Sequence, residues 1–185
     1  MKRKNMMVLF LLFTLAGAQA QQEERPEFRK LKPEEQVLVL DWLNGNCGVG
    51  EQSKLEQQLK AIGARLEPVF WEVYRLGPTR QELRNDSAAV IKRYGDRQNW
   101  LRQFGEAQMG REETARQLAI PAKQYIDREV GQYAERYKTA ALAGLGLIGT
   151  SRSERELIRI AGDEKNPAQT AAREALKTIR QRGGQ

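Results

Sequence analysis

Two pairs of arginines and a tyrosine are the residues whose types and spacing fit binding chemistry. Arg155 and Arg159 lie four residues apart, about one turn of a helix, within a segment of helical periodicity. Guanidinium groups bind carboxylates and phosphates through paired, charge-assisted hydrogen bonds. We therefore expect one basic and aromatic face, formed by Tyr74, Arg97, Arg102, Arg155 and Arg159. The alternative is a solvated face on which arginines pair with Glu154 and Glu156.

Such a face has the composition that the centres of protein interfaces favour. Its expected partner is another protein with an acidic surface, or an anionic polymer of the cell envelope.

The composition excludes several kinds of catalytic and metal site. The chain has no histidine, which rules out Ser-His-Asp and Cys-His machinery and histidine-bearing zinc or iron sites. Walker loops, G-x-G-x-x-G turns and Asp-rich calcium loops are also missing, so we expect no metal and no cofactor. A carboxylate pair acting on a glycoside remains open. The candidates, which fit helix capping or a solvated face better, are Asp41, Asp86, Asp96, Asp127 and Asp163.

Three tryptophans and one cysteine have competing interpretations. Trp42, Trp71 and Trp100 are each 29 residues apart, a spacing that fits a ladder of aromatic platforms for a sugar or peptide. Burial is the better account, because Trp71 and Trp100 fall within apolar helix cores. Cys47 lies in a glycine-rich turn with no adjacent basic residue to activate its thiol. We expect an incidental turn cysteine; the alternatives are a reactive thiol and an intermolecular disulfide.

The elements that would position these side chains follow a pattern that occurs twice. Ala-Ala-x-x-Gly-Leu-x-x-Ile over residues 140–148 recurs, 31 residues on, as Ala-Ala-x-x-Ala-Leu-x-x-Ile over residues 171–179. This spacing places the side chains on one stripe of a helix. Weaker copies end at Ile62 and Tyr94. The sequence distances between successive copies are similar for the first two and for the last two copies, and longer in between. This spacing predicts one repeat array with an insertion.

The C-terminal part of this pattern resembles short HEAT-like repeats, best known from the phycobilisome-lyase family. The resemblance is carried by Ala-Leu-x-x-Leu-Gly-x-Ile-Gly over residues 141–149, by Asp163 and Pro167, and by Ala-x-x-Ala-Leu-x-x-Ile over residues 172–179. It is clear only over residues 140–180, and no clean repeat lies between Gly95 and Gln132. It implies a small α-solenoid of stacked antiparallel helix pairs. No functional residue follows from it, and the alternative is two ordinary amphipathic helices.

No segment alternates with period two over the length of a strand, so we expect an all-α fold. Helices are predicted over residues 33–43, 53–64, 69–76, 79–94, 97–105, 115–119, 121–148, 156–161 and 171–179. A turn is expected at Gly95 and Asp96, and residues 106–114 are expected to be the insertion loop. The face of Gly144, Leu145 and Ile148 should pack against Leu176, Ile179, Leu157 and Ile160.

The N-terminus has the three parts of a secretory signal peptide. Lys2, Arg3 and Lys4 precede an apolar run over residues 6–18, which ends in Ala-Gln-Ala at residues 18–20. The predicted domains are a signal peptide (1–20), a flexible lead-in (21–32) and one helical-repeat domain (33–185). Cleavage would lower the formal net charge from +7 to +4, because 28 basic and 24 acidic residues would remain. The alternative is an uncleaved anchor.

We expect a periplasmic or secreted protein without stable membrane insertion after cleavage, and export argues against nucleic acid as a partner. The first functional hypothesis is a non-catalytic, protein-binding module of the bacterial cell envelope, acting as a scaffold or as an inhibitor of an envelope enzyme. The second is a carboxylate-dependent hydrolase or lyase acting on a polysaccharide or peptidoglycan. An enzyme should bring carboxylates together in a pocket with aromatic walls, whereas a module should have a broad groove.

We predict that the mature chain begins at Gln21, because signal peptidase cuts after the second small residue of the Ala-Gln-Ala site. Intact-mass spectrometry of protein purified from its native host should therefore give the mass of residues 21–185. A mass that includes Met1, or a chain kept in the membrane fraction after salt washing, would contradict the prediction.

Overall fold

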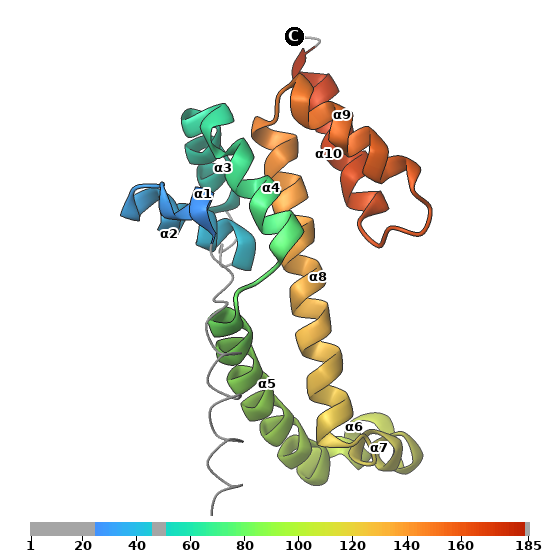
Figure 1. The fold of residues 1–185 in the computed structure, drawn as a ribbon. Coiled ribbons are helices and arrows are strands. Elements are labelled where there is room, and N and C mark those ends of the chain that lie inside the picture. Colours follow the sequence, from blue (N-terminus) through green and yellow to red (C-terminus); the bar gives the residue numbers. More distant parts are fainter. Residues whose placement is uncertain (1–24, 46–50, 184–185) are drawn as a thin grey trace, which may run out of the picture.

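The computed structural model describes residues 25–45 and 51–183, and every regular element in these ranges is a helix (Figure 1). The predicted all-α fold is thereby confirmed. The predicted signal peptide and Cys47 lie outside the described residues. The helices are α1 (Pro26–Arg29), α2 (Pro33–Asn44), α3 (Glu51–Ile62), α4 (Glu67–Leu76), α5 (Arg80–Trp100), α6 (Glu106–Met109), α7 (Arg111–Leu118), α8 (Ala122–Ile148), α9 (Ser151–Gly162) and α10 (Gln169–Gly183), with a 3₁₀ turn at Gly63–Leu66 and a π-helical turn at Leu101–Gly105.

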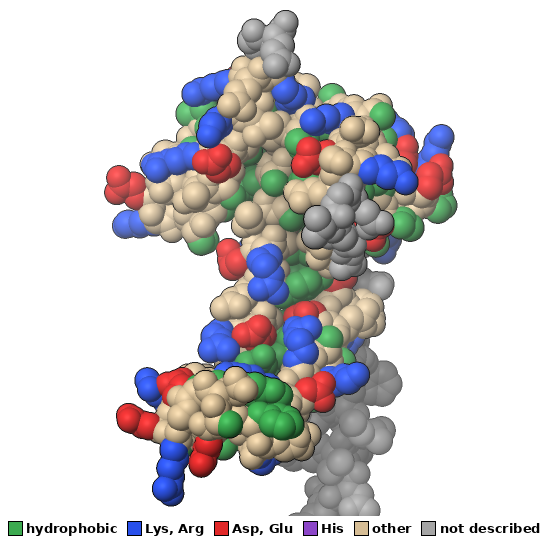
Figure 2. Space-filling view, turned by 180° about the vertical axis from the view of Figure 1, so that it is seen from behind, with side chains coloured by type: hydrophobic (Ala, Val, Ile, Leu, Met, Phe, Trp, Pro, Cys, Tyr) green, Lys and Arg blue, Asp and Glu red, His purple; other side chains and the backbone are tan. Residues whose placement is uncertain are grey.

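α8 is the axis of the molecule. It has 27 residues and is therefore about 40 Å long. Its C-terminal half lies in a head with α1 to α4, α9 and α10, whereas its N-terminal half runs beside α5 in an arm that ends in α6 and α7 (Figure 1). Seen from behind, a broad head narrows to a waist above the arm (Figure 2).

The C-terminal end of α8 is buried on nearly all sides. Every residue from 141 to 149 except Ala143 is buried. A Cβ added at Gly144 would lie 2.6 Å from the ring of Phe70 on α4, and one at Gly146 would lie 3.0 Å from the Cα of Ala175 on α10. Glycine is thus what allows α4 and α10 to lie directly against α8.

The predicted packing face is partly wrong. Gly144 lies against the ring of Phe70 on α4, and the glycine of α8 that lies against α10 is Gly146, at Ala175. The larger side chains of the predicted face do share one core: Leu145, Ile148, Leu157, Ile160, Leu176 and Ile179.

The helix ends follow local signals in the sequence. Thr79 begins α5, as predicted: its hydroxyl accepts the backbone N–H of Glu82 at 3.2 Å, and the Glu82 carboxylate accepts the N–H of Thr79. Gly45 follows α2 with φ 63° and Gly77 follows α4 with φ 72°, a backbone region that favours glycine. Gly77 and Thr79, between α4 and α5, mark where the head gives way to the arm.

The middle of the chain differs from the prediction. The turn expected at Gly95 is wrong, because α5 continues through it and passes into the π-helical turn. A glycine inside a helix costs only about 1 kcal/mol, and burial of Val90 and Leu101 on either side outweighs that cost. Residues 106–114 are not a loop; they belong to α6 and α7, which meet at Gly110 with φ 82°.

The lead-in also differs from the prediction. Residues 25–32 contain α1, and Leu31 is buried. The side chain of Arg25 is only 5% exposed. This stretch is therefore fastened to the head and does not form a flexible approach to it.

Two glycines of α8 offer a matched test of this packing. Gly131→Ala should raise the free energy of unfolding by about 0.5–1 kcal/mol, because nothing lies within 4 Å of a Cβ there and alanine favours helix. Gly144→Ala gains the same helix preference but should lower stability by about 1–3 kcal/mol, because the fully buried Phe70 ring must move. Thermal unfolding followed by circular dichroism measures both, and equal rises in Tm would contradict the packing.

Candidate functional site

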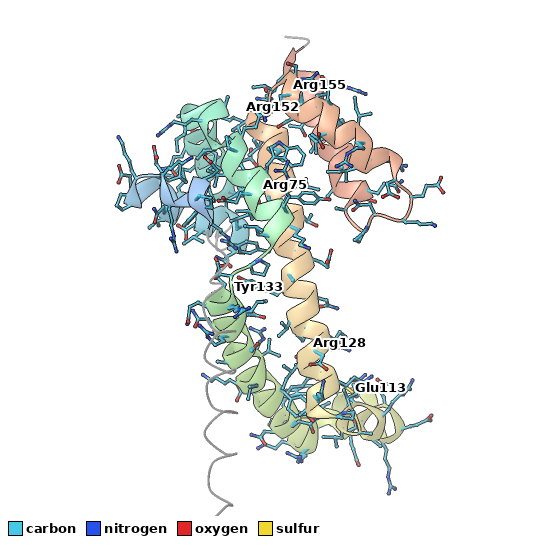
Figure 3. All side chains as sticks on the ribbon, in the orientation of Figure 1. Arg75, Glu113, Arg128, Tyr133, Arg152 and Arg155 are labelled. Carbon is cyan, nitrogen blue, oxygen red and sulfur yellow. The ribbon has the colours of Figure 1, made fainter. Side chains whose placement is uncertain are left out.

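A hollow of about 980 Å³ runs along the outer face of α4, between α1 and α9. We call it the α4 groove. Its floor is the exposed stripe of α4, and its walls come from α1 and from the first turns of α9. Arg75 reaches it from α4, and Arg152 and Arg155 from α9 (Figure 3). The lining residues are Pro26, Glu27, Ala64, Glu67, Pro68, Trp71, Glu72, Arg75, Leu76, Arg152, Arg155 and Glu156.

A polar network beside the groove fixes α9 to α4. Glu67, which is buried, accepts hydrogen bonds from the hydroxyl of Thr150 at 3.0 Å and from that of Ser153. The oxygen of Ser153 in turn accepts the indole N–H of Trp71 at 2.9 Å. Because Ser153 is fully buried and both its donor and acceptor are satisfied, Trp71 is held in one orientation.

The other glutamates of the groove also have partners inside the protein. The Glu72 carboxylate accepts the backbone N–H groups of Glu27 at 3.1 Å and Phe28 at 3.0 Å, and so holds the start of α1 against α4. Glu27 pairs with Lys30 at 2.7 Å, and Glu156 pairs with Arg159 at 3.3 Å. All four lining carboxylates are therefore engaged.

The arginines of the groove have no ion-pair partner among the described residues. Arg75 lies over the ring of Trp71, with its Cζ 5.8 Å from the ring centroid. Arg75, Arg152 and Arg155 are all exposed, and none forms a salt bridge with any carboxylate that the structure describes. The groove thus presents three guanidinium groups that pair with none of the carboxylates in residues 25–45 and 51–183.

The five predicted binding residues do not share one face. Arg155 lines the groove. Tyr74 lies edge-on against Trp71, with ring centroids 5.9 Å apart, and Arg159 is exposed one turn beyond Arg155, but neither lines the groove. The expected pairing of arginine with a neighbouring glutamate is found at Arg159 with Glu156.

Arg97 and Arg102 lie in the arm. Arg97 donates a hydrogen bond to the side chain of Gln117 and lies over the ring of Tyr125, at 5.7 Å. Tyr125 is near the start of α8, whereas Arg155 follows its end at Ile148, a separation of about 35 Å along the helix axis. Arg102 is exposed and only reaches Asn99, at 3.4 Å. The single basic face is therefore wrong.

Sequence reasoning missed Arg75 and Arg152. Arg75 lies one helical turn after Trp71, and Arg152 one turn before Arg155, so the local spacing was present in both cases. These two pairs come together because α4 and α9 lie beside each other in the fold. Arg75 and Arg152 are 77 residues apart in sequence.

The tryptophans do not form a ladder. Trp42 donates its indole N–H to the backbone oxygen of Ala140 at 2.7 Å, and Trp71 is buried. Trp100 is 43% exposed on the arm beside Phe104, so its predicted burial is wrong. Exposed apolar side chains are visible at the lower end of the arm in Figure 2.

The candidate aspartates have local roles where the structure shows a partner. Asp86 pairs with Arg93 at 3.7 Å, Asp127 pairs with Lys123, and Asp163 accepts the backbone N–H of Lys165 at 3.1 Å. In residues 25–45 and 51–183, no group of three or more potential metal ligands occurs.

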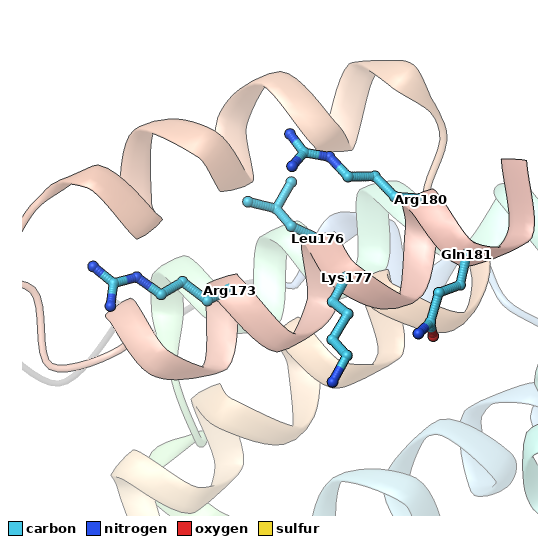
Figure 4. A pocket seen from close by; sticks show the side chains of 5 residues that line it. All are labelled: Arg173, Leu176, Lys177, Arg180 and Gln181. Atoms are coloured by element: carbon cyan, nitrogen blue, oxygen red, sulfur yellow. The ribbon is translucent and has the colours of Figure 1, made fainter. Parts of the chain in front are cut away.

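A second hollow lies on the outer face of α10 and is lined by Arg173, Leu176, Lys177, Arg180 and Gln181 (Figure 4). Arg180 bonds to Glu154 at 3.0 Å. This surface is basic but has no apolar floor beyond Leu176. It provides useful control positions for the α4 groove.

A buried ionic cluster joins the head to the arm. The Arg25 guanidinium pairs with Glu82 at 3.0 Å, donates to the hydroxyl of Tyr137 at 3.0 Å and donates to the backbone oxygen of Gly77. The Tyr137 hydroxyl donates to Glu82 at 2.6 Å. The cluster fastens the start of the described chain, the α4–α5 turn and α8 to one another.

The cluster shifts the ionisation of its members. Burial alone would raise the pKa of Glu82, but hydrogen bonds from Tyr137 and Thr79 and the charge of Arg25 lower it below the usual 4.5. Burial raises the pKa of Tyr137, and Glu82 adds to the effect. Burial and the charges of Glu82 and Asp86 raise the pKa of neighbouring Tyr133 to about 12.

Comparisons with protein-family models, with curated proteins and with solved structures found no match for this chain. Among the helices that the structure describes, none combines the length and the apolar character needed to cross a membrane.

Glu82→Gln tests the ionic cluster. Because the folded state lowers the pKa of Glu82, the carboxylate stabilises the fold fully above pH 4.5, and this contribution disappears as the pH falls through the lowered pKa. The substitution should cost about 1–3 kcal/mol at neutral pH, and the difference from wild type should narrow below pH 4.5. Urea unfolding at a series of pH values measures this, and a constant difference would contradict it.

Proposed function

We propose that this chain is an exported, non-catalytic binding module of the bacterial cell envelope that holds an acidic partner protein in the α4 groove. One observation carries the proposal: all four glutamates that line the groove have partners inside the protein, whereas its three arginines pair with no described carboxylate. The groove therefore has a surplus of charge-assisted hydrogen-bond donors. Carboxylates on a partner are their natural acceptors.

The groove also offers an apolar floor. Leu76 is 41% exposed, and Pro26, Pro68 and the indole of Trp71 border it. Apolar and aromatic surface rimmed by arginine is typical of the energetically important part of a protein interface. Because Ser153 holds Trp71 in place, little ordering would be needed on binding.

The proposal of export rests on the N-terminal sequence alone. A basic start, an apolar run and Ala-Gln-Ala at residues 18–20 favour cleavage and release into the periplasm or the medium. Within this setting the module would act as a scaffold or as an inhibitor of an envelope enzyme.

We also propose that α8, α9 and α10 are a short HEAT-like end of the fold. Support comes from the equivalent burial of the two sequence copies. Of the five motif positions that the two copies share, four are buried in both, namely Ala141 and Ala172, Gly144 and Ala175, Leu145 and Leu176, and Ile148 and Ile179. In such arrays each helix covers the apolar face of its neighbour.

The carboxylate-dependent hydrolase or lyase remains the alternative, because glutamates and Trp71 do line one groove. It has less support. Glu67 already accepts hydrogen bonds from the hydroxyls of Thr150 and Ser153, and Glu72 from two backbone N–H groups. A carboxylate engaged in this way is poorly placed to exchange a proton with a substrate.

Arg152→Glu with Arg155→Glu tests the proposed function. The immobilised mature chain should capture a partner from an envelope extract of the source cell, and the double variant should lose it because both positions then repel carboxylates. Arg173→Glu with Lys177→Glu, also at exposed positions and equal in charge change, should keep the partner. All three proteins should melt within about 2–4 °C of one another, since surface substitutions usually change stability little. Equal capture by all three would contradict the proposal.

A further inference from the structure

The α4 groove has the shape of a short trough. Its floor extends along α4 from Pro68 to Leu76, which corresponds to about 12 Å of helix. One wall is the start of α1, which Glu72 holds in place, and the other is the first turns of α9, which Glu67 holds through Thr150 and Ser153. Both walls are thus set by buried or half-buried hydrogen bonds, so the width of the trough is defined by the fold.

We infer that the element held in this trough is an amphipathic α-helix of the partner, with two carboxylates one helical turn apart beside an apolar stripe. The inference rests on the proposed function, because it specifies what the same groove would recognise.

The floor is long enough for a short helix. About 12 Å corresponds to about two helical turns, so side chains at i and i+3 or i+4 of a partner helix could both face the groove.

The spacing of the arginines on α9 also agrees with a helix as the bound element. Arg152 and Arg155 lie three residues apart on α9, so their side chains start about 5–6 Å from each other on one face of the helix. Carboxylates at positions i and i+3 or i+4 of a partner helix have the same separation. Residues on one face of a strand are farther apart, at about 6.6–6.8 Å.

The apolar side chains on the floor of the groove can contact the apolar stripe of the partner helix. Pro68 and Trp71 lie three residues apart on one face of α4, and Leu76 borders the same groove near the end of the helix. A second helix can lay its own apolar side chains on this face, as in helix-in-groove recognition. Arg75, stacked on Trp71, then lies at the edge of the contact as a third guanidinium.

A peptide selection tests the inference. A display library of random peptides of about 14 residues, or four helical turns, would be selected on the full mature chain and depleted on the Arg152→Glu/Arg155→Glu variant. We expect the recovered sequences to share acidic residues at i and i+3 or i+4 next to apolar residues at helical spacing. Bound to the protein, a recovered peptide should show a helical circular-dichroism difference signal.

The affinity of a recovered peptide provides the control. It should fall at least about tenfold for Arg152→Gln with Arg155→Gln, which removes two charge-assisted contacts, and stay within about twofold for Arg173→Gln with Lys177→Gln on α10. Recovered acidic peptides with alternating or irregular spacing, or with no helical signal when bound, would overturn the inference and leave the proposed function standing. Recovery of no peptide that depends on the two arginines would overturn both.

Discussion

The close approach of three helices at the C-terminal end of α8 is the constraint on which the rest of this structure depends. Phe70 of α4 meets Gly144, and the backbone of α10 at Ala175 meets Gly146. Protein interiors are packed to the density of organic crystals, so an extra carbon atom requires the Phe70 ring to move at Gly144 and the backbone of α10 to shift slightly at Gly146. Since α4 and α10 each lie against α8, and α9 packs against α10, these contacts place both sides of the α4 groove.

The surplus of hydrogen-bond donors in the groove follows from how its walls are held. A carboxylate that is buried or partly buried needs partners, and Glu67 and Glu72 find theirs in the elements that they fasten, the start of α9 and the start of α1. The acceptor oxygens of these two glutamates are thereby occupied by hydroxyl and backbone N–H groups. The arginines of the groove pair with none of the described carboxylates, so their N–H groups are available to acceptors on a partner.

The sequence was sufficient to predict most helices, because their signals are local. Apolar spacing and end signals such as Thr79 and Pro33 depend on a few neighbouring residues. Gly95 misled the prediction, since a helix tolerates a glycine when burial of its neighbours repays the small cost. The groove was not predictable, because Arg75 and Arg152 meet only through packing that no local pattern encodes. The assumption of stacked, equivalent repeats placed Arg97 with Arg155, although α8 separates them by most of its length.

Two sets of arginines with opposite environments show why residue type alone does not identify a binding site. Arg25 is as basic as Arg155, yet it is buried with Glu82, Tyr137 and the oxygen of Gly77, and its charge is used to fasten the head to the arm. Removing it would leave Glu82 without its counter-ion. Arg152 and Arg155 are exposed and pair with no carboxylate in the described part of the chain. Keeping two long cationic side chains beside an apolar floor contributes nothing evident to the fold, so binding is the better explanation for that arrangement.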